Sequence, residues 1–537
     1  MLMMLTSPDP TSTSPRVLAE ATRRRTFAVI SHPDAGKSTL TEALALHARL
    51  VDKAGATHGK ASRAASLSDW GEVERERGIS ITSTALRFDY HDVVVNLLDT
   101  PGHSDFSEDT FRVLTAVDFA VMLVDAAKGM EAQTRKLFDA CRRLGLPVVT
   151  VINKWDRPGL EALELFDDIQ EATGRTPVAV NWPVGYAGEF RGLLEPGAST
   201  YLRHEVVASG ARLAREEIVD GATDSGLGEE LWHEAVEGAG VAAELNGTFE
   251  AQPFLDGEQT PVLFAAAAGN IGVRYLLDFL LHRAPAPRPR PDEAGVARPL
   301  DAEFSGYVFK IQAGMNPAHR DQVAFVRVNS GVFSRGMELR HAQSGRPVSS
   351  KYAHHLVGRS RATVDESWPG DVVGFVNTTG LHVGDTIHEG SRVVFPGMPR
   401  FDPERFRVAR SLDTARHKRF TKGLAQLEEE GAIQLLRDSN GSPGGPVLAA
   451  VGELQFEVVY ERMRREFGVE IALDPPMPYS LSRPFARSEV STIASISGVE
   501  VLFRPSGEPV ALFPDRWRLS RVQEKHPDVF PERVSRG

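Results

Sequence analysis

Residues 31–38 have the residue types of a phosphate-binding loop. They read Ser-His-Pro-Asp-Ala-Gly-Lys-Ser and lie between an apolar run typical of a buried strand and a run with helical apolar spacing. A loop in that position presents backbone N–H groups to an anion at a helix N-terminus. Lys37 would reach the β- and γ-phosphates, and the Ser38 hydroxyl would be a magnesium ligand. Ser31 replaces the first glycine of the generic motif, so this loop alone could also be an ordinary turn.

Two further motifs with nucleotide chemistry follow predicted strands. Residues 99–103 read Asp-Thr-Pro-Gly-His, in which Asp99 could hold magnesium through water and the Gly102 N–H could meet a γ-phosphate. Residues 153–156 read Asn-Lys-Trp-Asp, and the Asp156 carboxylate could accept both guanine donors, N1–H and N2–H₂, which adenine lacks. Each motif alone could be a capping Asp or Asn in a loop. All three together, in this order and at strand ends, predict a site that prefers GTP.

Short apolar runs that alternate with helical stretches must position these loops. This alternation is typical of a mostly parallel sheet with helices on both faces. Leu40, Leu44 and Val51 mark one face of the helix that follows the first loop. The expected strands cover residues 27–30, 93–98, 121–124, 148–152 and 262–264.

Composition shifts divide the chain into a multidomain α/β arrangement. Alternating prolines from Pro285 to Pro291 indicate an extended connector, and short alternating strands without a helix follow it. Phe456, Val459 and Met463 then lie on one stripe of a helix that ends at Gly468. We expect a disordered leader over 1–24, a GTP-binding domain over 25–283 with an insertion at about 184–258, a Pro-rich linker over 284–300, a β-barrel domain over 301–397 and an α/β C-terminal domain over 398–537.

The overall charge excludes a protein that coats nucleic acid. The 537 residues carry 61 Lys+Arg against 72 Asp+Glu, a formal net charge of −11, so any RNA contact must be local. We interpret the group Arg462, Arg464 and Arg465 as a solvated helix face rather than an RNA contact. The lone cysteine, Cys141, excludes an internal disulfide. With no signal peptide and no apolar run long enough to span a membrane, we expect a cytoplasmic protein that has no membrane contact. We also expect it to be a monomer.

The motifs resemble those of the translational GTPases. The segments at 31–38, 77–81, 99–103 and 153–156 carry this resemblance through the first domain. Further segments are similar to the bacterial peptide chain release factor three family, over nearly the whole chain after residue 25. They are Ser-Asp-Phe-Ser-Glu-Asp-Thr at 104–110, Asp-Ala-Ala-Lys-Gly at 125–129, Thr-Arg-Lys-Leu at 134–137 and the long run from Phe309 to Phe325.

The resemblance implies roles for individual residues. His103 stands where the family orients the attacking water, with Pro33 and Ile79 as apolar neighbours, and Ser80 replaces the usual magnesium-binding threonine. Residues 265–267 are three alanines where a Ser or Thr is usual, so only backbone N–H groups could contact the guanine oxygen, which would weaken affinity. The metal set is Ser38, Ser80 and Asp99. The nucleotide-binding set is Ser31, His32, Pro33, Asp34, Ala35, Gly36, Lys37, Ser38, Thr39, Asp99, Thr100, Pro101, Gly102, His103, Asn153, Lys154, Trp155, Asp156, Ala266 and Ala267.

The function implied by the resemblance is a ribosome-stimulated GTPase that uses GTP/GDP and Mg²⁺. It would promote dissociation of the class-one release factor from the ribosome after peptide release, with rRNA and ribosomal proteins as partners and the class-one factor met indirectly. An alternative is another ribosomal translational GTPase, whose two further domains would not fit after the barrel. A non-hydrolysing GTP-bound scaffold is a second alternative, against which His103 argues. The chain lacks Gly-Gly-Gln, and its nearest string, 444–446, is Gly-Gly-Pro, so we expect no ester cleavage.

Overall fold

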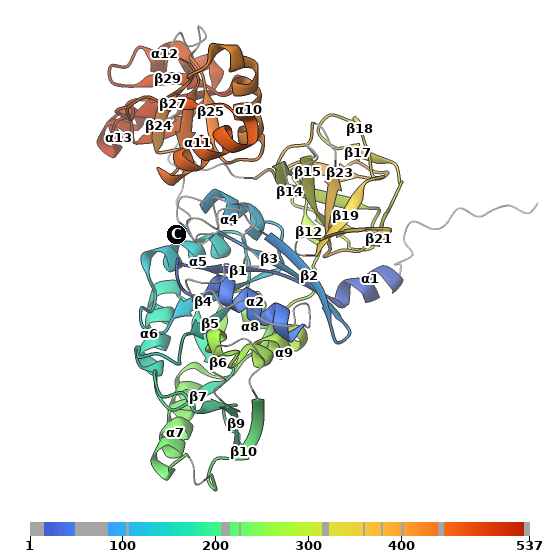
Figure 1. Cartoon of the computed structure of the whole chain (residues 1–537), viewed down its shortest axis with the longest axis vertical. Helices are drawn as coiled ribbons and strands as arrows, with labels where there is room; N and C mark the ends of the chain where they lie inside the picture. Colours follow the sequence, from blue (N-terminus) through green and yellow to red (C-terminus); the bar gives the residue numbers. More distant parts are fainter. Residues whose placement is uncertain are drawn as a thin grey trace, which may run out of the picture. The chain divides into compact units, whose positions relative to one another are not determined.

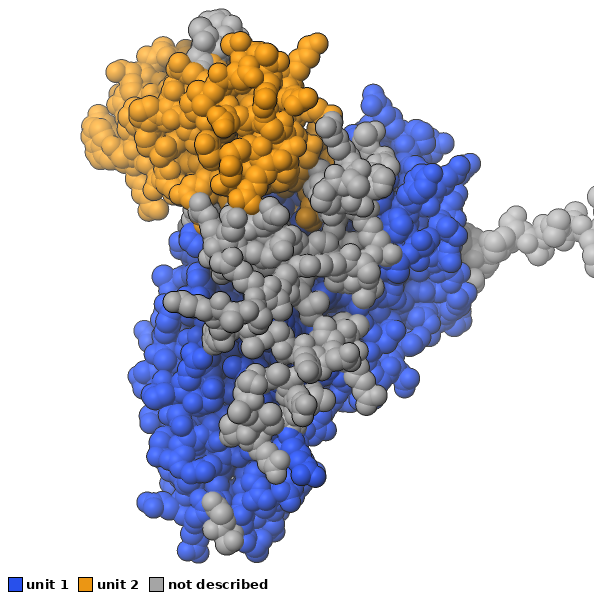
Figure 2. Space-filling view, in the orientation of Figure 1, with its two compact units in different colours: residues 1–103, 109–310, 323–397 blue, residues 104–108, 311–322, 398–537 orange. Residues whose placement is uncertain are grey.

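The computed structural model describes ten stretches of the chain and His103. It divides into two compact units, drawn in different colours in Figure 2. Unit 1 comprises residues 1–103, 109–310 and 323–397, and unit 2 comprises 104–108, 311–322 and 398–537. Unit 1 therefore spans both the predicted GTP-binding domain and the predicted barrel. The described residues are 15–48, 84–101, 103, 107–205, 215–224, 227–313, 322–357, 360–376, 380–398, 402–438 and 445–530.

A seven-stranded sheet organises the first part of unit 1 (Figure 1). Its order is β2-β3-β1-β4-β5-β11-β6, and every neighbouring pair is parallel except β2 with β3. The expected strands all lie in this sheet, which confirms the predicted fold class for this domain. The strands are β1 (Arg24–Ser31), β2 (Thr84–Tyr90), β3 (Val93–Asp99), β4 (Phe119–Asp125), β5 (Val148–Asn153), β6 (Thr176–Ala179) and β11 (Gln259–Phe264).

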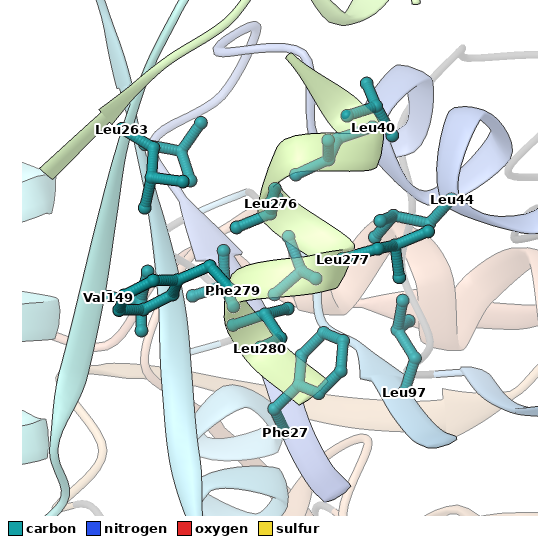
Figure 3. Close-up of a cluster of buried hydrophobic side chains, with 14 of the residues drawn as sticks. Phe27, Leu40, Leu44, Leu97, Val149, Leu263, Leu276, Leu277, Phe279 and Leu280 are labelled. Carbon is teal, nitrogen blue, oxygen red and sulfur yellow. The ribbon is translucent and has the colours of Figure 1, made fainter. Parts of the chain in front are cut away.

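Helices α2 and α9 cover one face of this sheet and build the core in Figure 3. Leu40 and Leu44 of α2 and Leu276 of α9 are buried in one cluster, and Phe27 of β1 stacks on Phe119 at 5.2 Å. The predicted apolar face of α2 is confirmed for these two leucines, whereas Val51 lies outside the described residues. The helices of this domain are α2 (Lys37–His47), α4 (Ser107–Leu114), α5 (Ala132–Arg143), α6 (Ala162–Thr173), α8 (Ala251–Leu255), α9 (Val273–Arg283) and the 3₁₀ turn η2 (Ala267–Gly269).

The predicted disordered leader is wrong for its last part. Residues Pro15–Thr22 form helix α1, which buries Val17 and Ala21, one turn apart. The Arg16 guanidinium lies 4.6 Å from the centre of the Trp368 ring and 3.0 Å from the Glu366 carboxylate. Packing on residues 350 positions away thus orders a segment whose polar composition alone indicates disorder. Residues 1–14 lie outside the described part of the chain.

The predicted insertion has its own small sheet and helix. Four strands pair antiparallel in the order β10-β9-β8-β7, and Trp232, Ala235 and Ala239 of helix α7 are buried. The strands are short and the helix is rich in alanine, which explains why no clear periodicity marks this region in the sequence. The elements are β7 (Trp182–Val184), β8 (Gly192–Leu194), β9 (Thr200–Glu205), β10 (Arg215–Asp220) and α7 (Glu229–Asn246).

The second part of unit 1 is a curled, mostly antiparallel β-domain, as predicted. Its main sheet has the order β18-β17-β23-β14-β15-β22-β19-β20, and the described residues between 303 and 397 contain no helix. Before it, the Pro-rich linker pairs β12 (Arg290–Pro291) with β13 (Ala297–Arg298). The strands are β14 (Ser305–Ala313), β15 (Gln322–Ser330), β16 (Phe333–Ser334), β17 (Leu339–His341), β18 (Pro347–Val348), β19 (Ala353–Val357), β20 (Ser360–Thr363), β21 (Glu366–Ser367), β22 (Val372–Val376) and β23 (Thr386–His388).

Buried charges join this β-domain to the seven-stranded sheet within unit 1. Arg327 of β15 donates to both carboxylate oxygens of Asp118, at 2.9 and 2.7 Å. Asp371 Oδ1 forms an ion pair with Arg24, 3.0 Å from its Nε, and Asp371 Oδ2 accepts from the Trp368 backbone N–H at 3.0 Å. All four charged side chains are at most 4 % exposed, so each buried charge needs its partner to offset the cost of leaving water.

Unit 2 contains two small α/β layers. The first sheet has the order β25-β26-β24-β27 beneath α10 and α11, and the second has the order β28-β30-β29. The predicted stripe Phe456, Val459 and Met463 is buried, and Gly468 ends α11 with a φ of 62°. The elements are β24 (Arg405–Ser411), η3 (Thr414–Arg416), α10 (His417–Glu429), β25 (Gln434–Leu436), β26 (Val447–Ala450), α11 (Leu454–Phe467), β27 (Ile471–Leu473), β28 (Leu481–Pro484), η4 (Arg487–Glu489), α12 (Val490–Ala494), β29 (Glu500–Phe503), β30 (Pro509–Phe513) and α13 (Arg516–Lys525).

Candidate guanine-nucleotide site

The first predicted motif forms the tight connection between β1 and α2. Strand β1 ends at Ser31 and α2 begins at Lys37. Asp34 and Gly36 have left-handed backbone conformations, with φ of 65° and 97°. A Cβ at Gly36 would lie 2.5 Å from Asn153 Nδ2, so only glycine fits at this position. The loop thus has the strand-to-helix geometry that presents N–H groups to an anion.

The second motif places a carboxylate beside the lysine of the first. Strand pairing puts Asp99 of β3 opposite Val29 of β1, and the Lys37 ammonium donates to Asp99 Oδ1 at 2.9 Å. The backbone N–H of Thr100 donates to the same oxygen at 3.1 Å. The other oxygen, Oδ2, is buried and has no hydrogen-bond partner among the described residues. This orphaned oxygen, near the start of α2 where Ser38 lies, fits a hard divalent cation.

Asn153 connects the phosphate-binding loop to the loop after β11. Its Nδ2 donates to the Ala35 carbonyl at 2.8 Å, and its Oδ1 accepts from the Ala267 N–H at 3.0 Å. Lys154 has a φ of 68° and donates its Nζ to the Asp34 carbonyl. Asn153 and Lys154 of the third motif therefore hold the phosphate-binding loop and the alanine loop (residues 265–267) together. The Asp156 side chain, in contrast, is exposed to solvent.

Asp125, at the end of β4, contacts the third motif, although the sequence analysis names it only within the segment 125–129 and not in the predicted site. It accepts from Lys154 Nζ at 2.7 Å and from the Ala127 N–H at 2.9 Å. Burial raises the pKa of Asp125, but these hydrogen bonds and the charge of Lys154 together hold the pKa below its usual value. Asp125 lies opposite Asn153 in the parallel pair of β4 and β5. Aligning the ends of the two predicted strands would therefore have placed Asp125 beside the third motif.

Two buried side chains of the predicted nucleotide-binding set, those of Trp155 and His32, contact other side chains of the protein. Trp155 is 1 % exposed, and its ring meets Phe264 edge-on at 4.8 Å, so its indole belongs to the core rather than to a ligand surface. His32 is 2 % exposed, and its Nδ1 lies next to the Glu131 carboxylate. Burial lowers the pKa of His32, which favours the neutral imidazole. Both residues act by holding the loops rather than by presenting side chains to a nucleotide.

The alanine loop uses most of its backbone donors internally. The Ala266 N–H donates to the Ile271 carbonyl at 3.1 Å, and the Ala265 N–H donates to the Ile152 carbonyl at 2.9 Å. The Ala267 N–H already donates to Asn153, so a guanine oxygen could contact it only by sharing or replacing that bond. Both alanines of the predicted set therefore have N–H groups that already donate to protein acceptors.

The predicted hydrolysis residues are only partly described. His103 is half-buried, Pro101 is buried, and Thr110 Oγ1 donates to the Pro101 carbonyl at 3.3 Å. Pro33 is exposed beside the phosphate-binding loop. The predictions for Gly102, Ile79 and Ser80 lie outside the described residues.

Neither a cluster of metal-binding side chains nor a membrane-spanning helix occurs in the described part of the chain. In those stretches, no three His, Cys, Asp or Glu side chains form a group able to hold a metal ion. The helices of these same stretches include none that is long and apolar enough to cross a membrane.

Comparison with known families accounts for nearly the whole chain. Residues 22–286 match the model of the elongation factor Tu GTP binding domain, and residues 303–390 match elongation factor G domain 2. Residues 395–523 match the class II release factor RF3 C-terminal domain. The three matches occur in the order expected from the sequence.

Curated relatives extend the similarity across all of these regions. The peptide chain release factor 3 of Microcystis aeruginosa is 43 % identical over 516 residues, which cover 94 % of each chain. That of Gloeobacter violaceus is 43 % identical over 530 residues, covering 96 % of this chain and 98 % of the relative. A crystal structure of a Thermus thermophilus protein has a TM-score of 0.69 at 23 % identity, covering 91 % of this chain and 72 % of that one, and so shares the fold.

Proposed function

The chain belongs to the peptide chain release factor 3 family, and from this premise we propose that it promotes departure of the class-one release factor from the ribosome after peptide release. Membership makes it a GTP-binding translational GTPase of termination that is stimulated by the ribosome. The observation that carries the site assignment is that the ends of β1, β3 and β5 lie together. Lys37 contacts Asp99 at the end of β3, and Asn153 at the end of β5 donates to the phosphate-binding loop.

The phosphate end of the site rests on Lys37, Ser38 and Asp99. In the nucleotide complex the Lys37 ammonium would donate to the β- and γ-phosphates in place of Asp99. Ser38 and Asp99 would hold Mg²⁺, and Ser80 would complete the set. The buried Asp99 Oδ2 without a hydrogen bond supports this role. Bound magnesium would neutralise charge on the phosphate oxygens.

At the guanine end of the site we assign base recognition to Asp156. Its exposed carboxylate follows Asn153 and Lys154, whose hydrogen bonds fix the loop. Asn153 and Lys154 fix the loop through Ala35, Ala267 and Asp125. Asp156 would then accept the two guanine donors, and Ala267 would offer its N–H to the guanine oxygen. The nucleotide is recognised by a carboxylate that the surrounding bonds hold in place.

Hydrolysis in this family of reactions depends on positioning and charge stabilisation more than on covalent chemistry by the protein. We assign His103 to orienting the attacking water, with Pro33 and Ile79 as its apolar neighbours. The chain has no Gly-Gly-Gln, so it leaves the peptidyl ester to the class-one factor. It would act as a monomer in the cytoplasm, where it meets the class-one factor through the ribosome.

The test measures GTP hydrolysis and departure of a fluorescent class-one factor from post-release ribosomes. Wild-type protein with GTP should accelerate departure without releasing peptide by itself. His103→Ala should bind GTP normally but lose about 100-fold in ribosome-stimulated turnover. Unaccelerated departure, or peptide release by this protein alone, would exclude the proposed role. A wild-type turnover rate in His103→Ala would assign the water to another group.

A further inference from the structure

Unit 2 contains two groups of basic residues on the neighbouring helices α10 and α11. The α11 group is Arg462, Arg464 and Arg465, which the sequence indicates as a solvated face; Arg464 and Arg465 are exposed, whereas the Arg462 side chain is only 16 % exposed. The α10 group is Lys418, Arg419 and Lys422, at the start of that helix, and all three are exposed. The two groups have similar composition but differ in what surrounds them.

Carboxylates neutralise the α11 group. Arg462 contacts Glu430 at 2.9 Å and Glu466 at 2.6 Å. Arg464 and Arg465 both contact Glu461, at 2.9 and 3.2 Å. These arginines therefore have little positive charge left to offer a partner.

The α10 group has no such neutralisation. Among the described residues, none of Lys418, Arg419 and Lys422 forms an ion pair or side-chain hydrogen bond. The nearby Arg416 differs, because it contacts Asp413 at 3.2 Å and donates to the Gly468 carbonyl. The first two turns of α10 thus present three unpaired cations on a chain whose net charge is −11.

The charges on α10 also oppose the helix dipole. The first turn contains no acidic residue, and the last turn contains no basic one; instead, residues 428–430 are all glutamate. Cations near a helix N-terminus are unfavourable because the unpaired backbone N–H groups there are already positive. An external anion would relieve both the repulsion among the lysines and the repulsion from the helix end.

Close packing fixes the direction of this surface. Gly423 lies against α11, and a Cβ there would approach Met463 Sδ to 2.7 Å and Phe467 Cγ to 2.9 Å. Phe420 and Leu424 are buried on the same side of α10. Lys418 and Lys422, four residues apart, therefore share a face that points away from the core.

We propose that Lys418, Arg419 and Lys422 form a docking surface for the phosphate backbone of ribosomal RNA, a proposal that rests on the proposed ribosomal function. The three cations have the charge that RNA phosphates need. Phe420, which lies between Arg419 and Lys422 in the sequence, is buried and cannot stack on bases, and the His417 ring lies against it with the ring centroids 6.1 Å apart. The contact is therefore with backbone phosphates and is independent of base sequence. It is the local RNA contact that an overall acidic chain requires.

The test compares two double variants with the same change in charge. Lys418→Ala/Lys422→Ala alters the proposed surface, and Arg464→Ala/Arg465→Ala is the matched control on α11. Binding is measured across a salt series to a fluorescent fragment of deproteinised ribosomal RNA, and to intact ribosomes with a non-hydrolysable GTP analogue. The α10 variant should weaken binding to both about tenfold and lower the slope of log affinity against log salt by about 2. The control should stay within about twofold.

Other outcomes would overturn the proposal. Weaker binding to ribosomes with unchanged RNA binding would indicate an acidic protein partner, and equal losses in both variants would indicate a general charge effect. Unchanged binding of the α10 variant would exclude the surface altogether. GTP affinity and thermal unfolding report folding, and the α10 variant should unfold no earlier than wild type because its dipole repulsion is gone. Failure of wild-type protein to accelerate factor departure would overturn the proposed function while leaving the RNA result intact.

Discussion

Buried carboxylates serve two different purposes in unit 1. At the boundary between the sheet and the β-domain, both oxygens of Asp118 accept from Arg327, and both oxygens of Asp371 have partners. In the nucleotide site, Lys37 and the Thr100 N–H both donate to one oxygen of Asp99, and the other oxygen has no partner in the described structure. Fully bonded carboxylates stabilise the fold, whereas a half-bonded one leaves a position for a ligand.

The largest predicted loss of stability comes from removing the ion pair between Asp118 and Arg327 at the boundary between the sheet and the β-domain. Asp118→Ala leaves the buried Arg327 guanidinium without its carboxylate, so the free energy of unfolding should fall by about 3–5 kcal/mol. Denaturant unfolding measures the loss, and GTP affinity of the folded protein should change little. The control is Asp118→Leu with Arg327→Met, which removes both charges and should recover much of the stability. A loss of nucleotide affinity at full stability would contradict the division between the two regions.

The lysine of the site should matter for binding. Lys37→Ala removes a charge-assisted hydrogen bond to phosphate worth about 3 kcal/mol, so GTP affinity should fall about 100-fold. Equilibrium titration with a fluorescent GTP analogue measures this. Lys351→Ala provides a control, because Lys351 is an exposed lysine of unit 1 in the β-domain, outside the nucleotide-binding segments. Equal affinities of Lys37→Ala and wild type would remove the Lys37–Asp99 pair from the site.

Base selectivity should change without any effect on stability. Asp156→Asn replaces a double acceptor by one acceptor and one donor, so GTP affinity should fall about 10- to 100-fold while xanthosine triphosphate gains. Parallel titration of the two nucleotides checks the exchange. The unfolding transition should not move, because the Asp156 side chain is exposed. Unaltered relative affinities would place guanine recognition elsewhere.

The smallest predicted effect is the contribution of His355, in the β-domain, to the pH dependence of the free energy of unfolding. Burial, assisted by Arg87, lowers the pKa of His355 to about 4. The unfolded chain takes up the proton below about 6.5, so this residue costs stability as the pH falls from 6.5 towards 4, by about 1 kcal/mol at pH 5.5. His355→Gln should remove that part of the loss in unfolding measured at pH 7.5 and 5.5. Identical pH dependence in both proteins would show that His355 is protonated in the folded state.

Short sequence motifs predict much of the nucleotide site but little of the contact between the sheet and the β-domain. The phosphate-binding loop, Asp99 and Asn153 follow from motifs that each occupy a few consecutive residues after an apolar strand. The pairing of Arg24 with Asp371 joins residues 347 positions apart, and nothing near either residue indicates its partner. For the same reason α1 reads as disordered, since the aromatic ring that orders it belongs to another domain.

Neighbouring residues of one motif can also differ in how deeply the structure buries them. Trp155 and Asp156 are adjacent in one motif, yet Trp155 is 1 % exposed while Asp156 is exposed. The motif defines where the loop lies, but the alternation of side chains around Lys154, with its left-handed backbone, decides which residue faces solvent. The use of the Ala266 N–H within its own loop is likewise a consequence of tertiary hydrogen bonds.

Strand β1 runs between the boundary with the β-domain and the nucleotide site. Its first residue, Arg24, forms an ion pair with Asp371 in the β-domain, and its last residue, Ser31, begins the phosphate-binding loop. Eight extended residues form a rod about 23 Å long, and two parallel neighbours clamp it along its sides. Hydrogen bonds to both neighbours hold this strand along its length. The boundary with the β-domain and the start of the phosphate-binding loop are therefore the two ends of one continuous strand.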